Sequence, residues 1–459
     1  MPASGHRYSI GASALLWALA TTAVGRAAEP AAQPLTLATC VASALAANPQ
    51  LVAARENARA AGANSWSAWS GYLPSIGGDA SETRATSNPH YGETTTLLPS
   101  GTAVTFPTTN RVKDNGASTS YLAGITARQA ILDVSRFAAI QQARASDREA
   151  AELLRQTRQA VHFAAVQAFY NCLRAQRLLA VQDGAFKQLQ EHARSAHAFV
   201  DVGSRPRMDA VQADANLANA KVALIRARNA LRVARLSLTL AMGSNEDLAW
   251  DPSDPFETPR IPESTGDLHT AALLHRADIL AAVARLDQAR SGVWNARSEF
   301  LPTVSASAGY RWSGADFPLP WNWQIGASAS WSFFSSGGSL ARARAADARV
   351  DGAAAVVESA KQTARTEVEQ AWSSLGEAQE RTEATQAAVA QAALALELAD
   401  ARYRTGAGSP LELTDARSVK LTADTNRVEA LCDRAIAASG LDKATGMLGE
   451  GEPRPLEVK

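Results

Sequence analysis

Two stretches of this chain carry the same apolar pattern, and that pattern restricts the folds open to the chain. In the first stretch, from Val161 to Val200, apolar residues follow one another at spacings that alternate between four and three residues. The second stretch, from Ala364 to Tyr403, repeats the pattern 203 residues later, and its polar interruption at Thr385 matches Gln182. A period of 3.5 residues is typical of helices that supercoil around a neighbour and pack knobs into holes. The sequence therefore predicts two long coiled helices related by tandem duplication.

Other matches extend the duplication over most of the chain. Residues 71–74 match residues 299–302 at an offset of 228. Two pairs of glycines match at the offset of 203, namely Gly203 with Gly406 and Gly243 with Gly446. A Pro/Asp-rich segment joins the two halves and has the composition of a linker. The predicted organisation is a first repeat at 28–243, a linker at 244–266, a second repeat at 267–446 and a C-terminal tail at 447–459.

Each repeat is expected to contain a helical hairpin whose tip lies at Gly203 or Gly406. If the first long helix begins near Val134, it is on the order of 100 Å long at 1.5 Å per residue. The returning helix of the first repeat continues the apolar spacing. In the second repeat the matching positions include charged residues, so we expect that seam to be set differently or to face water. These charged positions are Lys420, Arg427 and Arg434.

Four short segments alternate between apolar and polar residues instead, near 74–84, 121–132, 302–312 and 322–334. Such alternation, with aromatic residues near the segment ends, is typical of transmembrane strands. A soluble sandwich would show the same alternation, but strands interleaved with very long helices favour the membrane interpretation. The segment 85–119 is rich in Thr, Ser, Pro and Asn and is expected to form an extracellular loop. In the last two segments one face carries the apolar residues Val304, Ala306, Ala308, Tyr310 and Trp312, with Trp323, Ile325, Ala327, Ala329, Trp331 and Phe333.

The N-terminus has the order of a secretory signal peptide. Arg7 precedes an apolar run at 10–24, and small residues follow it, so we predict a signal peptide at 1–27. Residues 37–40 resemble a lipidation box, but Cys40 lies well past the apolar run and is interpreted as part of a helix. No later apolar stretch has the length of a transmembrane helix, so entry into a membrane would have to occur through a β-barrel.

Composition argues against chemistry at an active site. The 45 basic and 45 acidic residues balance, which gives no indication of a nucleic-acid partner. Three cysteines cannot form a disulfide framework, and the seven histidines show no metal-ligand spacing. The chain lacks a Gly-x-Ser-x-Gly or His-Glu-x-x-His motif, and a hydrolase is disfavoured on that ground. We expect no catalytic residues, no metal and no cofactor, and thus no enzyme.

In their order, these features resemble the TolC-type outer membrane efflux proteins, also called outer membrane factors, over nearly the whole mature length. The resemblance is carried by residues 35–37 and 44–51, which recur loosely at 271–279, and by the two Leu-Pro pairs that precede strands. It is also carried by the strand ends at 131–133 and 333–335 and by the duplicated glycine tips.

This resemblance implies a mixed, mainly α fold. Long coiled helical hairpins would form a periplasmic tunnel, and the four strands of each chain would contribute to a shared transmembrane β-barrel. Since four strands are too few to close a barrel, the implied assembly is a homotrimer with twelve strands. The resemblance also implies outer-membrane lipid, a periplasmic adaptor protein and an inner-membrane pump as partners, and passive conduction of substrates in efflux or type I secretion.

Two sets of site residues follow from the resemblance. The helix-to-helix turns would face the adaptor, although glycine at a helix end also has a simple role in turn geometry. Just after the second turn, Glu412 and Asp415 share one helix face and would form a carboxylate ring at the tunnel constriction. The alternative is that Ser409 and Glu412 form a capping box. The tip residues are Val202, Gly203, Ser204, Arg205, Thr405, Gly406, Ala407 and Gly408.

A second class of function fits the same elements. A trimeric, barrel-anchored structural or adhesive stalk would also combine coiled helices with membrane strands. Such a protein is expected to place its anchor at one end of the chain, whereas the strands here fall inside both repeats.

Overall fold

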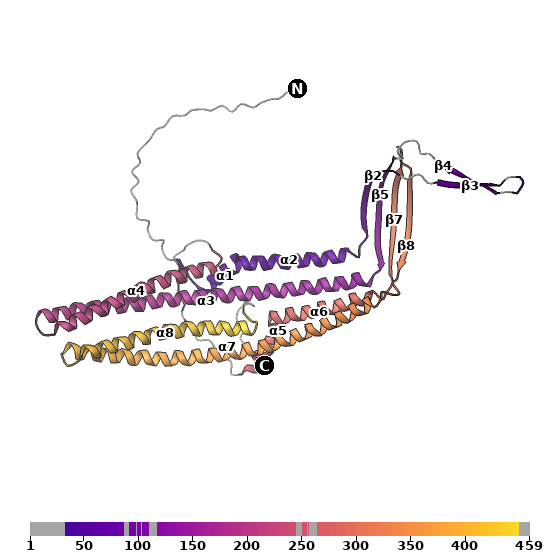
Figure 1. Cartoon of the computed structure of the whole chain (residues 1–459). Helices are drawn as coiled ribbons and strands as arrows, with labels where there is room; N and C mark the ends of the chain where they lie inside the picture. Colours follow the sequence, from indigo (N-terminus) through magenta and orange to yellow (C-terminus); the bar gives the residue numbers. More distant parts are fainter. Residues whose placement is uncertain are drawn as a thin grey trace, which may run out of the picture.

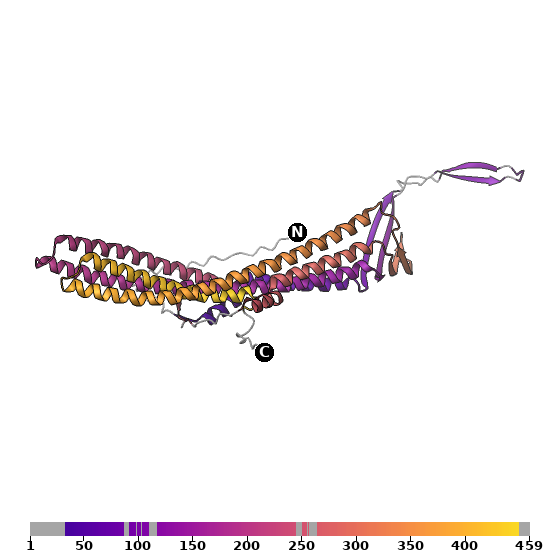
Figure 2. The ribbon, with the colours of Figure 1, turned by 90° about the horizontal axis from the view of Figure 1, so that it is seen from below.

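The chain folds into a long rod of helices with a small sheet at one end (Figures 1 and 2). The predicted signal peptide lies outside the described residues, as do most of the linker and of the C-terminal tail. The computed structural model describes residues 33–86, 91–97, 99–101, 103–109, 117–244, 250–254, 256 and 264–448.

Two helical hairpins dominate the rod, as the apolar pattern predicts. Helix α3 (Val134–Asp201) pairs with α4 (Arg207–Ala241), and α7 (Gly338–Arg404) pairs with α8 (Pro410–Ala444). Helix α3 begins at the expected position because the Asp133 carboxylate accepts hydrogen bonds from the backbone N–H groups of Ser135 and Arg136, at 3.0 and 3.3 Å. The repeated seam is buried at matching positions in α3 and α7, namely Val161, Ala165, Cys172 and Ala196, and Ala364, Val368, Leu375 and Ala399.

Shorter helices lengthen both hairpins toward the sheet. In the first repeat α1 (Leu37–Ala47) and α2 (Pro49–Ser70) lie along α3, and in the second α5 (Thr265–His275) and α6 (Ala277–Ser298) lie along α7. Helix α6 also packs against α3 and so joins the two repeats. Strands β1 (Gln33–Leu35) and β6 (Trp250–Pro252) pair in parallel beside this region.

A glycine closes each junction between hairpin and short helices. Gly243 has φ of +70°, and a Cβ atom there would lie 2.8 Å from the backbone of Ala47. Gly446 has φ of +78°, and its Cβ would lie 2.7 Å from the backbone of His275. Only glycine fits such a close backbone approach in a left-handed conformation. The glycine spacing seen in the sequence therefore marks the same joint in both repeats.

The sheet at the end of the rod has four antiparallel strands in the order β2-β5-β7-β8. Their bounds are Ser75–Thr86, Ala117–Leu132, Thr303–Gly314 and Trp321–Ser330. A second hairpin, β3 (Tyr91–Leu97) with β4 (Ala103–Thr109), projects beyond the sheet (Figure 1). It lies within the segment 85–119 that is expected to form an extracellular loop. Its strands were not predicted, because they are rich in Thr and lack the apolar alternation on which strand prediction depends.

The register of the sheet gathers apolar residues on one face. Ala308 lies opposite Ile325, Tyr310 opposite Trp323, and Trp312 opposite Trp321, so the predicted apolar faces of the last two strands coincide. The last strand is shorter than predicted. It ends at Ser330. The side chain of the next residue, Trp331, donates a hydrogen bond from its indole N–H to the Phe300 carbonyl at 3.1 Å.

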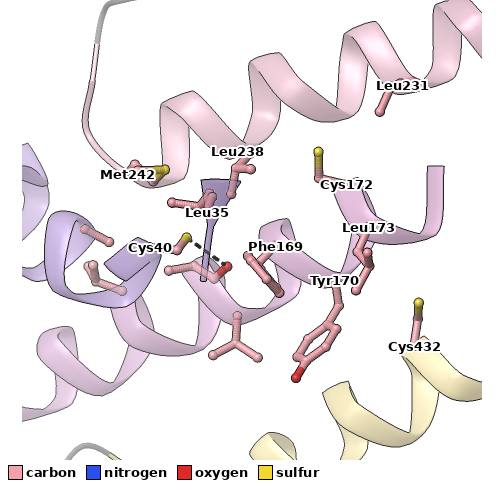
Figure 3. Packing of buried hydrophobic residues seen from close by; sticks show 14 of the residues in the cluster. Leu35, Cys40, Phe169, Tyr170, Cys172, Leu173, Leu231, Leu238, Met242 and Cys432 are labelled. Carbon is pink, nitrogen blue, oxygen red and sulfur yellow. Dashed lines mark hydrogen bonds between the residues drawn. The ribbon is translucent and has the colours of Figure 1, made fainter. Parts of the chain in front are cut away.

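The largest core cluster lies where α1 docks on the first hairpin (Figure 3). Cys40 sits inside α1, fully buried, with its sulfur 3.9 Å from the Ala165 carbonyl oxygen. Burial raises the pKa of the Cys40 thiol to about 12. Cys172 and Cys432 are also buried, and all three cysteines are free. The structure thus gives Cys40 the packing of an ordinary helix residue.

Among the described helices, none alone combines the length and hydropathy of a membrane span, and only the pair α1 and α2, bent by 48°, meets that criterion together.

Candidate functional site

The two hairpin tips lie at the same end of the rod, far from the sheet (Figure 1). Gly203 and Gly406 adopt left-handed backbones, with φ of +75° and +78°. Their N–H groups donate to the carbonyls of Val200 and Tyr403, at 2.9 and 3.1 Å. Both glycines therefore end a helix by the turn geometry expected from sequence. Gly408 has a second constraint, because a Cβ there would lie 3.0 Å from the Tyr403 backbone nitrogen.

A cluster that we call the tip clasp joins the first hairpin to the second. It consists of Arg205, from the first turn, Tyr403, from the last turn of α7, and His192, on α3. The Arg205 guanidinium lies 4.5 Å from the centre of the Tyr403 ring, and its Nη2 donates to the Tyr403 carbonyl at 3.2 Å. The His192 and Tyr403 rings meet edge to face, with centroids 5.3 Å apart.

Sequence reasoning missed two of the three clasp residues. Tyr403 was assigned to the apolar seam, and it is buried there, but its ring also receives Arg205. His192 was one of several scattered histidines, although its position next to the buried seam residue Ala193 could have indicated burial. Arg205 was predicted as one of the adaptor-facing tip residues, without its contact to Tyr403.

The two acidic residues of the expected constriction lie at the start of α8. The Ser409 hydroxyl accepts a hydrogen bond from the Glu412 N–H at 3.1 Å, so Ser409 caps the helix. The Glu412 carboxylate accepts from Arg402 Nη1 at 2.8 Å, which pairs its charge with α7. Asp415 is exposed. The chain therefore presents Glu412 together with a basic partner that sequence reasoning did not assign.

The expectation for the returning helix of the second repeat was wrong. Ala423, Ala430 and Leu441 are buried, so the α8 seam keeps the spacing found in α4. Arg434, which occupies the place of Leu231, is itself only 8% exposed and donates to the Phe256 carbonyl at 3.3 Å. A long aliphatic stem with a hydrogen-bonded head can fill such a position.

An ion pair between Arg174 and Asp433 also links the two hairpins. The Asp433 carboxylate on α8 accepts a hydrogen bond from Arg174 on α3 and a second from Arg381 on α7, the latter at 2.7 Å. These side chains are partly exposed, so the pairs are expected to add little net stability, and their directional contacts help to set the relative position of the helices.

At the opposite end of the molecule, the sheet has two open edges. Strands β2 and β8 each have one neighbour in the sheet, and all of their residues are exposed. The apolar face includes Ile76 and Ile325, each 76% exposed. Within the described residues there is no group of three His, Cys, Asp or Glu side chains arranged to hold a metal ion.

A helical rod that carries a membrane-type sheet on one end defines an outer-membrane channel protein. The chain belongs to the outer membrane efflux protein family, whose model matches residues 40–244 and 268–447. Its place is thus the outer membrane, with a helical extension into the periplasm, and the family is one of channels rather than of enzymes.

Relatives and solved structures agree with this assignment. The chain is 26% identical to the outer membrane efflux protein BepC of Brucella suis over 65% of each chain. It is 30% identical to the outer membrane protein OprJ of Pseudomonas aeruginosa over 48% of this chain and 47% of the relative. The matches thus span 65% and 47% of the length of these two curated relatives. The CmeC outer membrane channel of Campylobacter jejuni has the same fold, with a TM-score of 0.78 at 21% identity over 89% of this chain and 85% of the other.

Proposed function

We propose that this chain is a subunit of a passive conduit through the outer membrane, serving a tripartite efflux or type I secretion system. The observation that carries the proposal is the four-stranded sheet with two open edges and one apolar face. In a bilayer every backbone N–H and C=O group needs a partner, and open edges leave groups without one. Copies of the same chain would supply the missing partners by pairing β8 of one copy with β2 of the next.

Three copies would close a barrel of twelve strands, which is within the range of membrane barrels. A second apolar stripe, on α4, supports close packing between copies. Its large side chains are between 47% and 78% exposed, and the stripe advances in steps of three or four residues when Ala215, Ala218 and Asn229 are included. Such spacing suits a coiled contact with a helix of the neighbouring copy. These side chains are Met208, Val211, Val222, Ile225, Val233, Leu236 and Leu240.

The tips would face the periplasmic partners. They form the end of the rod opposite the membrane-type sheet, so they are the part of the chain nearest the inner membrane. Exposed apolar side chains at both tips, Val202 at 75% and Leu411 at 68%, offer contact area to a helical adaptor. An inner-membrane pump would deliver substrate through that adaptor, and the conduit itself would need no cofactor.

The test combines assembly with conduction. We expect detergent-extracted protein to have about three times the mass of the mature chain by native mass spectrometry, and to form ion-conducting pores in planar bilayers. A folded monomer would contradict the shared barrel. A trimer without conductance would favour the alternative, a barrel-anchored structural or adhesive stalk. Loss of efflux in a strain that lacks the gene, restored by the intact gene, would separate transport from anchoring in cells.

A further inference from the structure

Within the tip clasp, a buried histidine lies among charged groups of both signs. His192 is 9% exposed and lies under the Tyr403 ring, whose other contact is the Arg205 guanidinium. Tyr403 is thus in contact with Arg205 of the tip turn and with His192 of α3. Protonation of His192 would therefore place a second positive charge against the Tyr403 ring, in addition to that of Arg205.

The charged groups around His192 come from every element packed on it. Besides Arg205, Arg417 on α8 adds a positive charge, while Asp209 on α4 and Asp400 on α7 add negative ones. The two acids are already engaged, Asp209 with Arg205 at 3.7 Å, and Asp400 with Arg404 and Arg417 at 2.8 and 3.7 Å. On α3 itself, Glu191 and Arg194 pair with each other at 2.8 Å. Asp209 and Asp400 thus favour a protonated His192, but each already shares its charge with an arginine, which weakens the compensation that it can give.

The clasp is also incompletely satisfied as it stands. The Tyr403 hydroxyl and one Nη atom of Arg417 are buried, and no group within the described part of the chain lies in hydrogen-bond range of either. Buried polar atoms without partners are costly. These two unpaired atoms therefore offset part of the stabilisation that the clasp contacts provide.

We propose that His192 makes the tip clasp sensitive to acid, so that uptake of one proton releases Tyr403 from Arg205 and separates the tips of the two hairpins. The proposal concerns regulation of the proposed conduit. It rests on the proposed function only in calling the tips the periplasmic mouth.

The direction of the pH effect follows from the difference between the pKa of His192 in the closed clasp and in the open clasp. Burial and, to a lesser extent, Arg417 lower the pKa of His192 to about 4, whereas a histidine freed from the clasp regains its ordinary pKa near 6.5. A lowered histidine pKa favours the closed clasp fully above pH 6.5, and this preference is lost as pH falls toward 4. The equilibrium should shift toward open tips by up to tenfold per pH unit within that window.

Hydrogen exchange read by mass spectrometry tests this on the assembled protein in detergent. Exchange at the C2 position of histidine rings gives each pKa directly, and His197 is an internal reference because it is exposed and pairs with Asp214 within the first hairpin. We expect the pKa of His192 to lie at least one unit below the ordinary histidine value near 6.5. A pKa of His192 at that ordinary value would overturn the proposal.

Hydrogen exchange of the backbone amides then measures the opening of the clasp itself. After correction for intrinsic rates, peptides containing Tyr403 should exchange faster as pH falls from 7.5 to 5.5, by up to tenfold per unit below pH 6.5. His192→Gln should abolish this rise, and the matched control His197→Gln should keep it. A rise that persists in His192→Gln would assign the effect to another titratable group and contradict the proposal.

If His192→Gln already loosens the tip at pH 7.5, His192→Phe takes its place, because a ring that cannot be protonated preserves the contact with Tyr403. Peptides from α6, remote from the tips, should respond to pH equally in all variants. These readouts measure opening rather than transport, so a failed conduit and a failed pH response remain distinguishable.

Discussion

At the scale of single residues, the glycines divide into two kinds. Gly203 and Gly406 need a left-handed backbone but have open space where a side chain would go. Gly243 and Gly446 need that backbone and also lie against another helix junction. The sequence predicted their correspondence between repeats. It did not reveal the second role, because the approach of Ala47 and His275 involves residues distant along the chain.

This difference gives a matched pair of variants. Gly203→Ala should cost about 1–2 kcal/mol, the strain of placing an L-residue in a left-handed conformation. Gly243→Ala should cost at least about 2 kcal/mol more, since its methyl group would overlap the Ala47 backbone. Thermal and denaturant unfolding of the detergent-solubilised protein, followed by circular dichroism, measures both. Equal losses of stability would mean that the junction yields without strain.

The role of the two carboxylates at the second tip can be tested with substitutions that remove their charge and keep their size. Glu412→Gln with Asp415→Asn should keep stability, because Ser409 still caps α8, and should lower cation preference in planar-bilayer recordings. Arg402→Gln should act in the opposite direction, since it leaves the Glu412 charge unpaired. If ion selectivity is the same in all three proteins, these acids do not line the conduit, and helix capping is the remaining role of this segment.

At the scale of elements, the repeated seam shows what a sequence pattern can and cannot predict. The 3.5-residue spacing predicted α3 and α7 and the burial of their seam. In α8 the same spacing includes Lys420, Arg427 and Arg434, and hydropathy suggested a different face. The structure keeps the face, because Arg434 finds the Phe256 carbonyl and the Lys420 ammonium pairs with Asp424 at 2.5 Å. The Asp424 partner is local, but the Phe256 partner lies in the distant linker and cannot be inferred from local periodicity.

Exchanging residues between the two seams tests this account. Arg434→Leu should change the free energy of unfolding by no more than about 1 kcal/mol, because hydrophobic replacements of buried polar groups are often close to neutral. Leu231→Arg, at the matching place in α4, should cost about 3 kcal/mol or more, because no partner is provided for its charge. Denaturant titration compares them. Symmetrical effects would show that both seams tolerate charge alike.

A matched pair of substitutions tests whether the apolar face of the sheet contacts lipid. Ile325→Arg should destabilise the membrane-inserted form by about 2–4 kcal/mol if the residue faces lipid near the membrane centre. Gln324→Arg, one residue away on the opposite face, should be tolerated. The yield of heat-stable oligomer from outer-membrane fractions reports the difference. An equal loss for both variants would argue against a lipid-facing row at Ile325.

At the scale of the whole molecule, the hairpin tips and the sheet that is proposed to enter the membrane lie at opposite ends of the rod (Figure 1). A substitution at a tip can therefore be tested apart from membrane insertion. Gly203→Val or Gly406→Val should strain a turn by about 1 kcal/mol or more while leaving the remote sheet intact. We expect efflux to fall several-fold and outer-membrane insertion to persist. Site-specific crosslinking to the adaptor provides a second readout. Intact crosslinking and intact efflux would show that the tips are not the docking ends.

The open edges of the sheet have a kinetic consequence for the cell. If other copies complete the β-region, as proposed, the chain folds that region in a step of higher order in chain concentration. Halving expression would then lower the rate of channel maturation more than twofold, and chains awaiting neighbours would expose Ile76 and Ile325 to aggregation and proteolysis. The amount of channel in the envelope would follow gene dosage steeply, through assembly kinetics rather than through the stability of any one chain.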